Sequence, residues 1–181
     1  MTAEPVVLVT GFGPFPGTPR NPTARTARAV DGALVLGHRV RGLVLPVSFQ
    51  RGPDAAIEAA RTLSARLVVG LGVANARTAV CVERVGVRVP AGSADVDGRT
   101  DSLLDGPDEV RATLDTACLA TALGATLSDD AGRYVCNAWL YRVAHALEVP
   151  VGFVHVPAAG IEPRRVLEGV TALLQGMRDP A

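Results

Sequence analysis

Residues 67–73 read Leu-Val-Val-Gly-Leu-Gly-Val, and residues 151–156 read Val-Gly-Phe-Val-His-Val. Apolar side chains fill almost every position of both runs, and each run is shorter than a typical helix. Runs of this kind are typical of strands that are buried on both faces of a parallel sheet. The two runs therefore predict a central sheet that is covered by helices on both sides.

Further runs rich in β-branched residues alternate with longer stretches in which apolar residues recur at helical spacing. The predicted strands in chain order are residues 6–10, 40–47, 67–73, 79–89, 133–135 and 151–156. The predicted helices are residues 22–30, a helix that begins at Pro53, a helix that begins within 105–109 and ends near Leu123, residues 139–147, and residues 163–177. This alternation predicts an α/β protein with a single domain over residues 1–181, built as a three-layer α/β/α sandwich around a largely parallel, twisted mixed sheet. Residues 90–107 are rich in Gly, Asp and Ser and are expected to form a mobile surface loop.

The charge composition excludes several classes of function. The 18 basic residues balance 18 acidic residues, so no basic surface for nucleic acid is expected. All basic residues are arginine, which excludes a Schiff-base lysine, a phosphate-loop lysine and a Ser/Lys dyad. No apolar run has the length of a membrane span, and no leader with basic and apolar parts is evident. We therefore expect a cytoplasmic protein that has neither nucleic acid nor a membrane as a partner.

Three cysteines are present, and one of them is a candidate nucleophile. Cys81, Cys118 and Cys136 show no paired spacing, so we predict neither disulfides nor structural zinc, and no cofactor. Cys136 follows a short predicted strand and precedes an amphipathic helix, so its thiol would lie at the positive end of a helix dipole, which favours the thiolate. The alternative is a buried cysteine that only fills space, which is our interpretation of Cys81 and Cys118.

Of the three histidines, His155 is the one that interrupts a buried strand. It lies near the carboxyl end of that strand, where ligands bind in open α/β sheets, and it would serve there as a base. A core histidine with satisfied hydrogen bonds is the alternative. His38, in a turn, and His145, off the apolar stripe of its helix, are expected to be exposed to solvent.

Glu83 is a carboxylate inside the apolar run 79–89. A charge in such a position is costly unless it is paired. Its partner would be either a neighbouring arginine, Arg77 or Arg84, or the ring of His155, which it would then orient. The residues alone leave this choice open.

Four short segments resemble signatures of the pyroglutamyl peptidase I family, also called pyrrolidone-carboxylate peptidases. They are Thr10–Phe15 followed by Asn21-Pro22, then Leu71-Gly72 and Arg77 followed by Glu83-Arg84-Val85, then Ala131-Gly132 followed by Val135-Cys136-Asn137, and finally Phe153–Pro157. The segments occur in the family's order and run over most of the chain. Each is short, but the four together are specific.

The resemblance implies an α/β/α fold and a cysteine peptidase that removes an N-terminal pyroglutamyl residue from peptides. It implies a triad in which Cys136 is the nucleophile, His155 the base and Glu83 the residue that orients the histidine. It also implies a homo-oligomer. No metal or cofactor takes part in the implied reaction.

The substrate contacts implied by the resemblance are only partly like those of the family. Phe12 and Phe15 would enclose the lactam ring, and Asn21 would contribute to the same site. The family usually has Gln where this chain has Val73, and it has an arginine, thought to help hold the oxyanion, where this chain has Ser93. Two alternatives therefore stay open: an amidase that acts on another small cyclic amide, and a weakly active or non-catalytic member that binds a small ligand.

Overall fold

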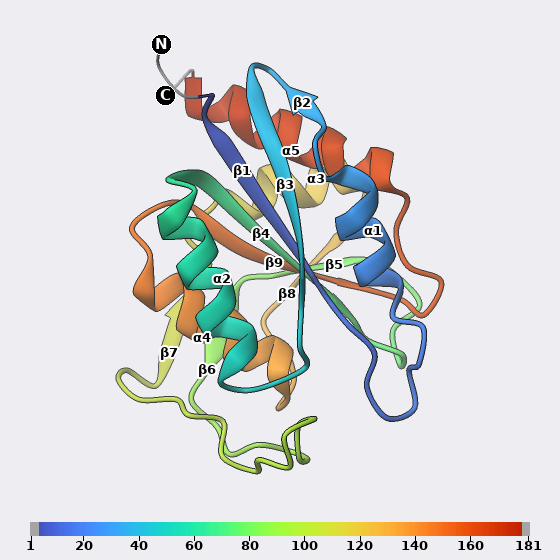
Figure 1. The fold of residues 1–181 in the computed structure, drawn as a ribbon, viewed down its shortest axis with the longest axis vertical. Helices are drawn as coiled ribbons and strands as arrows, with labels where there is room; N and C mark the ends of the chain where they lie inside the picture. The colour runs from blue at the N-terminus through green and yellow to red at the C-terminus, as the bar shows by residue number, and fades with distance from the viewer. Residues whose placement is uncertain (1–3, 179–181) are drawn as a thin grey trace.

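A seven-stranded sheet runs through the centre of the protein in the order β2-β3-β1-β4-β9-β5-β8 (Figure 1). The computed structural model describes residues 4–178. The strands of this sheet are β1 (Val6–Phe12), β2 (Leu34–Val35), β3 (His38–Leu45), β4 (Ala65–Val73), β5 (Cys81–Glu83), β8 (Thr126–Ser128) and β9 (Val151–Val156). Neighbouring strands are parallel, except that β2 runs antiparallel to β3 and β5 runs antiparallel to β9. The predicted mixed, largely parallel sheet is confirmed.

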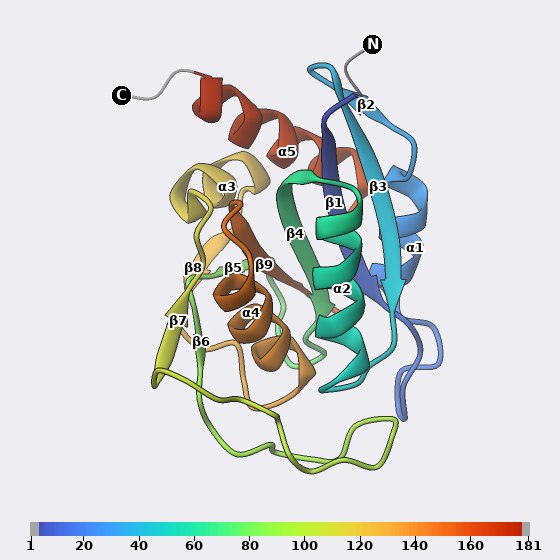
Figure 2. The same ribbon diagram turned by 60° about the vertical axis from the view of Figure 1, so that its left-hand side comes forward.

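Helices cover both faces of this sheet (Figure 2). They are α1 (Pro22–Val30), α2 (Arg51–Thr62), α3 (Thr116–Leu123), α4 (Val135–Ala146) and α5 (Pro163–Arg178). Helices α1, α3 and α5 pack on one face, and α2 and α4 pack on the other. The three-layer α/β/α sandwich is therefore confirmed. Within residues 4–178, no helix combines the length and the apolar character that crossing a membrane requires.

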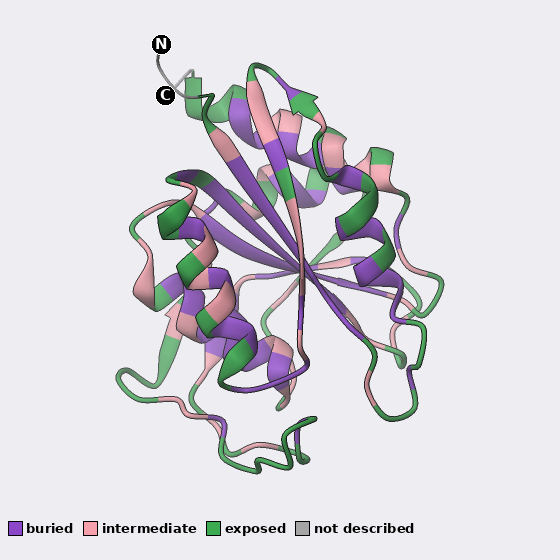
Figure 3. Ribbon diagram, viewed as in Figure 1, coloured by how far each residue is buried: buried purple, intermediate pink, exposed green. Residues whose placement is uncertain are grey.

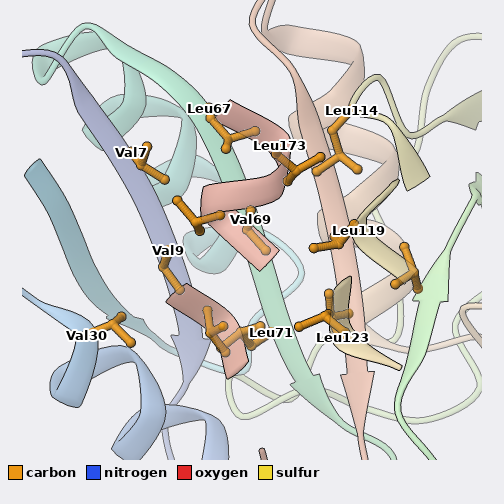
Figure 4. Close-up of a cluster of buried hydrophobic side chains, with 14 of the residues drawn as sticks. Val7, Val9, Val30, Leu67, Val69, Leu71, Leu114, Leu119, Leu123 and Leu173 are labelled. Atoms are coloured by element: carbon orange, nitrogen blue, oxygen red, sulfur yellow. The ribbon is translucent and has the colours of Figure 1, made fainter. Parts of the chain in front are cut away.

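Two apolar cores hold the three layers together. Successive side chains of a strand point to opposite faces, so Val7 and Val9 of β1 belong to one core and Leu8 and Phe12 to the other. In the first core, shown in Figure 4, leucines of α3 and α5 pack on valines of the sheet. Figure 3 shows that the central strands are buried along most of their length, as continuous apolar runs predict.

Residues 79–89 do not form the single strand that the sequence predicts. They form β5 and a second strand, β6 (Val85–Val87), which pairs with β7 (Glu109–Arg111) in a separate two-stranded sheet. The break lies at Arg84, whose N–H donates to the Ser128 carbonyl and whose carbonyl accepts from the Ala112 N–H. Arg84 thus passes the chain from one sheet to the other while its backbone groups stay paired.

Two further predictions close to the helix starts were wrong. The helix expected to begin within 105–109 begins only at Thr116, because residues 109–111 pair with β6 and Asp115 caps the helix by accepting from the Cys118 N–H at 2.9 Å. Residues 133–135 form no strand: Arg133 and Tyr134 form a bend, and Val135 is the first residue of α4. Residues 90–107 contain neither helix nor strand, as predicted, and pass below α2 and α4 in Figure 1.

Candidate active site

Gly72 lets helix α4 approach the sheet closely at the carboxyl end of β4. A Cβ atom on Gly72 would lie 2.7 Å from the Sγ atom of Cys136 and 2.6 Å from the ring of Phe153. A Cβ atom on Gly70 would lie 2.6 Å from the ring of Trp139. Close-packed interiors leave no room for such contacts, so only glycine fits at these two positions. Cys136, the second residue of α4, is thereby held directly against the sheet.

His155 lies in the strand next to Gly72, with which it is paired in the β4–β9 ladder. It is therefore a neighbour of Cys136 on the same face of the sheet. On its other side, Nδ1 of His155 lies 2.7 Å from Oε1 of Glu83. His155 is 4% exposed and Glu83 is fully buried. The structure thus brings together the three residues that the sequence analysis singled out from three separate elements.

Glu83 has both of the partners between which the sequence left a choice. Oε1 of Glu83 accepts from His155 and also lies 2.9 Å from Nη1 of Arg77. Arg84, the other candidate, points away and pairs with Asp129. The buried carboxylate is therefore compensated by an arginine and oriented toward the histidine at the same time.

Electrostatics favour a protonated ring at His155. Burial of the ring favours its neutral form, but the negative charges of Cys136 and Glu83 outweigh burial and raise the pKa of His155 to about 9. At neutral pH the ring is therefore protonated. The thiol of Cys136 is partly exposed, and it lies at the first turn of α4, where backbone N–H groups lack partners within the helix and the helix dipole is positive. These groups suit a thiolate and the oxyanion that forms when it attacks a carbonyl.

A small pocket of about 30 Å³ opens beside Cys136. All four predicted substrate contacts line it, namely Phe12, Phe15, Asn21 and Val73. Phe12 is buried in the core between the sheet and α4, whereas Phe15 is only partly buried. The pocket offers mostly apolar walls directly next to a thiol, which suits a small, uncharged ring.

Three residues of the pocket were missed by the sequence analysis: Val47, Tyr134 and Val135. Tyr134 and Val135 directly precede Cys136 in the chain, and this adjacency is the sequence signal for both. The Tyr134 ring packs against Phe15 with 6.3 Å between ring centroids and against Phe49 with 5.6 Å. Val47 follows β3 and comes to the pocket only through the tertiary fold.

Asn21 lines the pocket, but its polar atoms are engaged within the protein. Its Nδ2 donates to the Gly13 carbonyl at 3.0 Å, and its Oδ1 accepts from the N–H and the hydroxyl of Thr23 at 3.1 and 2.8 Å. Asn21 is therefore the N-cap of α1 and fixes the loop that carries Phe15. Phe15 itself is held by a tight turn in which it exchanges backbone hydrogen bonds with Thr18.

The remaining cysteines and histidines lie outside the pocket. Cys118 is in α3 on the opposite face of the sheet. Cys81 lies in β5 across from His155, with its sulfur 3.3 Å from the Thr126 hydroxyl. His145 is exposed, as predicted, whereas His38 is only partly so, because it is the first residue of β3.

The loop that carries Ser93 runs alongside the residues that lead to Cys136. The Gly92 N–H donates to the Arg133 carbonyl at 2.7 Å, and the Tyr134 hydroxyl donates to the Ala94 carbonyl at 3.1 Å. Ser93, between these two anchors, is exposed. Of the arginines beside this loop, Arg88 pairs with Asp108 and Arg133 donates to the Pro90 carbonyl.

An α/β/α sandwich that holds a thiol at a helix N-terminus, beside a histidine and a carboxylate, has the arrangement of a cysteine-dependent hydrolase. Comparison with known families identifies the family within this class. Residues 6–170 match the profile of the pyroglutamyl peptidase family. The chain belongs to this family.

Individual relatives agree with the family profile. The chain is 34% identical over 169 residues to a pyrrolidone-carboxylate peptidase of Halalkalibacterium halodurans. The aligned region covers 85% of this chain and 84% of the relative. The chain is 33% identical over 196 residues to that of Cupriavidus taiwanensis, which covers 96% and 90%. The solved structure of the pyrrolidone carboxyl peptidase from Thermococcus litoralis superimposes with a TM-score of 0.87 at 27% identity over 96% of this chain and 95% of the other. That from Pyrococcus furiosus gives 0.82 at 26% identity over 94% and 96%.

Proposed function

We propose that this chain is a cysteine omega-peptidase that removes an N-terminal pyroglutamyl residue from peptides through an acyl-enzyme. The observation that carries the proposal is the position of Cys136 between His155 and an apolar pocket with aromatic walls. Membership of the pyroglutamyl peptidase family supports it. The names of the relatives agree, since they are pyrrolidone-carboxylate peptidases.

In the proposed reaction the pyroglutamyl ring occupies the pocket next to Phe15. The Cys136 thiolate attacks the carbonyl carbon of the scissile amide, and backbone N–H groups at the start of α4 stabilise the oxyanion. The His155 imidazolium then donates its proton to the leaving amine as the C–N bond breaks, which leaves a thioester. Water attacks the thioester, His155 takes a proton from it, and pyroglutamate is released.

The pocket also provides a reason for selectivity. A free N-terminal amine is charged at neutral pH, and it would lose its solvation between apolar walls. The lactam ring of pyroglutamate is uncharged and avoids this cost. The proposed partners are therefore peptides with a blocked, pyroglutamyl N-terminus, and we propose a cytoplasmic homo-oligomer on the basis of the family resemblance.

A fluorogenic pyroglutamyl amide tests the proposal directly. We expect the chain to release the fluorophore, and we expect Cys136→Ala to abolish release while Cys118→Ala, a matched change outside the pocket, leaves it intact. Thermal unfolding should show that both variants are folded. Iodoacetamide should label Cys136 faster than Cys81 or Cys118, because the thiolate is the reactive form.

The outcomes separate the alternatives. No release together with rapid labelling of Cys136 would favour an amidase for another small cyclic amide, an alternative suggested by the apolar Val73 in the pocket wall. No release and equal labelling of the three cysteines would favour a non-catalytic member. Release by the Cys136→Ala variant would contradict the assignment of the nucleophile.

A further inference from the structure

Arg77 contacts the Glu83 carboxylate from the solvent side. It lies in the loop between β4 and β5, and its Nη1 is 2.9 Å from Oε1 of Glu83. The arginine side chain is 25% exposed, whereas the Glu83 side chain is fully buried. Arg77 therefore connects a carboxylate inside the protein to a charge that is still partly solvated.

Both partners of Glu83 converge on one of its oxygens. Oε1 contacts His155 and Arg77, while Oε2 is buried without a hydrogen-bond partner among residues 4–178. Any change in the charge of Arg77 therefore acts on the same atom that holds the His155 ring. The groups form a row of alternating charge, from the Arg77 guanidinium through the Glu83 carboxylate and the His155 imidazolium to the Cys136 thiolate.

We infer that Arg77 is a positioning residue that limits the proton affinity of His155, so that the ring can act as a base when the acyl-enzyme is hydrolysed. The inference rests on the proposed function. Once the thioester has formed, Cys136 carries no charge, and Glu83 is the one member of the row that still stabilises the imidazolium. A buried carboxylate with no other partner would keep the ring protonated and unable to take a proton from water. Arg77 contacts the same oxygen, and its positive charge reduces the stabilisation that the carboxylate gives to the imidazolium.

The surroundings of His155 allow this effect to be isolated. The titratable groups that face it are Glu83 and Cys81 from β5, Cys136 from α4 and, through Glu83, Arg77 from the loop before β5. The neighbour in β4 is Gly72, which has no side chain. Removing Cys136 therefore leaves Glu83 and Arg77 as the main charges that act on the ring.

Arg77 also ties the nucleophile's segment to this carboxylate. Its Nη2 donates to the Asp130 carbonyl at 2.5 Å and lies 3.4 Å from the Ser128 hydroxyl, and the Asp130 side chain accepts from the Gly132 N–H at 2.9 Å. These residues lead from β8 to Cys136. A purely structural role for Arg77 would run through this tether, so the experiment must separate the tether from the charge.

The test is a titration of His155 by NMR in the Cys136→Ala protein, which resembles the acyl-enzyme in lacking the thiolate. The chain has three histidines, so a His155→Gln variant assigns the signal. Adding Arg77→Gln should raise the titration midpoint of His155 by about one pH unit or more. The reason is that the carboxylate of Glu83 loses the positive charge of Arg77 and then stabilises the imidazolium more strongly. Gln ends at about the position of the arginine Nε atom, so it loses the tether together with the charge. Arg77→Met does the same and should raise the midpoint by a similar amount, whereas Arg77→Lys keeps the charge and so separates the charge from the tether.

Matched variants decide the outcome. Arg84→Gln neutralises the neighbouring arginine, which pairs with Asp129, and should leave the midpoint unchanged, while Arg77→Lys should keep it near that of the parent. Equal midpoints in the parent and both neutral Arg77 variants would overturn the inference. Because this titration needs no turnover, its result does not depend on the peptidase proposal.

A kinetic measurement applies the same test to the active protein. The substrate is an activated pyroglutamyl ester, whose hydrolysis is limited by deacylation. The acidic limb of its kcat profile should move to higher pH in Arg77→Gln.

Discussion

His155 is protonated at neutral pH because its neighbours outweigh its burial. The negative charges of Cys136 and Glu83 raise the pKa of the ring to about 9, so the proton is present below that pH and lost above it. Cleavage of an amide needs this proton for the leaving amine. We therefore expect kcat/KM for a pyroglutamyl amide to fall as the pH rises through about 9.

The variant Glu83→Gln checks this assignment. It removes one of the charges that stabilise the imidazolium, so the alkaline limb of kcat/KM should move to lower pH. Profiles of kcat/KM against pH, between neutral pH and pH 10, measure the alkaline limb of the parent and of the variant. An alkaline limb that does not move in the variant would mean that another group controls it.

The two phenylalanines of the pocket should respond differently to truncation. Phe12 is 3% exposed and belongs to the core beneath α4, so Phe12→Ala should destabilise the protein by about 3–5 kcal/mol. Phe15 is only partly buried on a surface turn, so Phe15→Ala should cost little stability and should mainly lower kcat/KM. Denaturant unfolding and kinetics of both variants test the contrast. Normal kinetics in a folded Phe15→Ala variant would show that Phe15 only packs against Tyr134.

Individual site residues were easier to predict than their partners. Cys136 and His155 are unusual within their own elements, and a polar group in an apolar run is visible in the sequence. The double pairing of Glu83 with His155 and Arg77 was not predictable, because it depends on how β5 is placed beside β9. Val47 reaches the pocket from the segment that follows β3 and carries no local signal at all.

At the scale of elements, the loop of residues 90–107 carries Ser93, at a position where the family resemblance leads us to expect an arginine. Ser93 lies between two anchors that hold the loop against the segment before Cys136. If the arginine that the family has at this position helps to bind the oxyanion, Ser93→Arg should raise kcat on pyroglutamyl amides, by up to roughly 10²-fold for one added donor. The measurement is kcat for the parent and the variant. A Ser93→Ala variant controls for loop damage, and an unchanged kcat in Ser93→Arg would refute a role of this position in the oxyanion site.

Helices and strands were predicted well where a local sequence signal sets their bounds, and poorly where long-range strand pairing sets them. The strand 151–156 and the helix 22–30 have the predicted bounds, because a buried apolar run and an Asn-Pro cap are local signals. Residues 109–111 were expected to be helical, but their backbone pairs with β6, a segment more than 20 residues away. Long-range pairing of this kind overrides a helical pattern in three residues.

For the whole molecule, the alternation of buried runs and amphipathic stretches was enough to predict the layers. The sequence did not indicate that β5 lies between β9 and β8, antiparallel to β9 and parallel to β8. That reversal follows from the short connection between β4 and β5, which contains no crossover helix and therefore returns the chain in the opposite direction. The site depends on it, because β5 carries the carboxylate.

The pairing of β5 with β9 sets the distance that the side chain of residue 83 must span to reach His155. Glu83 is opposite Phe153, two residues from His155, and such diagonal neighbours in a sheet are about 7–8 Å apart. A glutamate spans this offset and reaches Nδ1 at 2.7 Å. An aspartate is shorter by one carbon–carbon bond, about 1.5 Å, and would stop beyond hydrogen-bonding range. Glu83→Asp should therefore lower kcat/KM by roughly 10²-fold although it keeps the charge, and retained activity would show that the strands can slide. The choice of glutamate over aspartate is thus set by the spacing of the strands, and not by the acidity of the side chain.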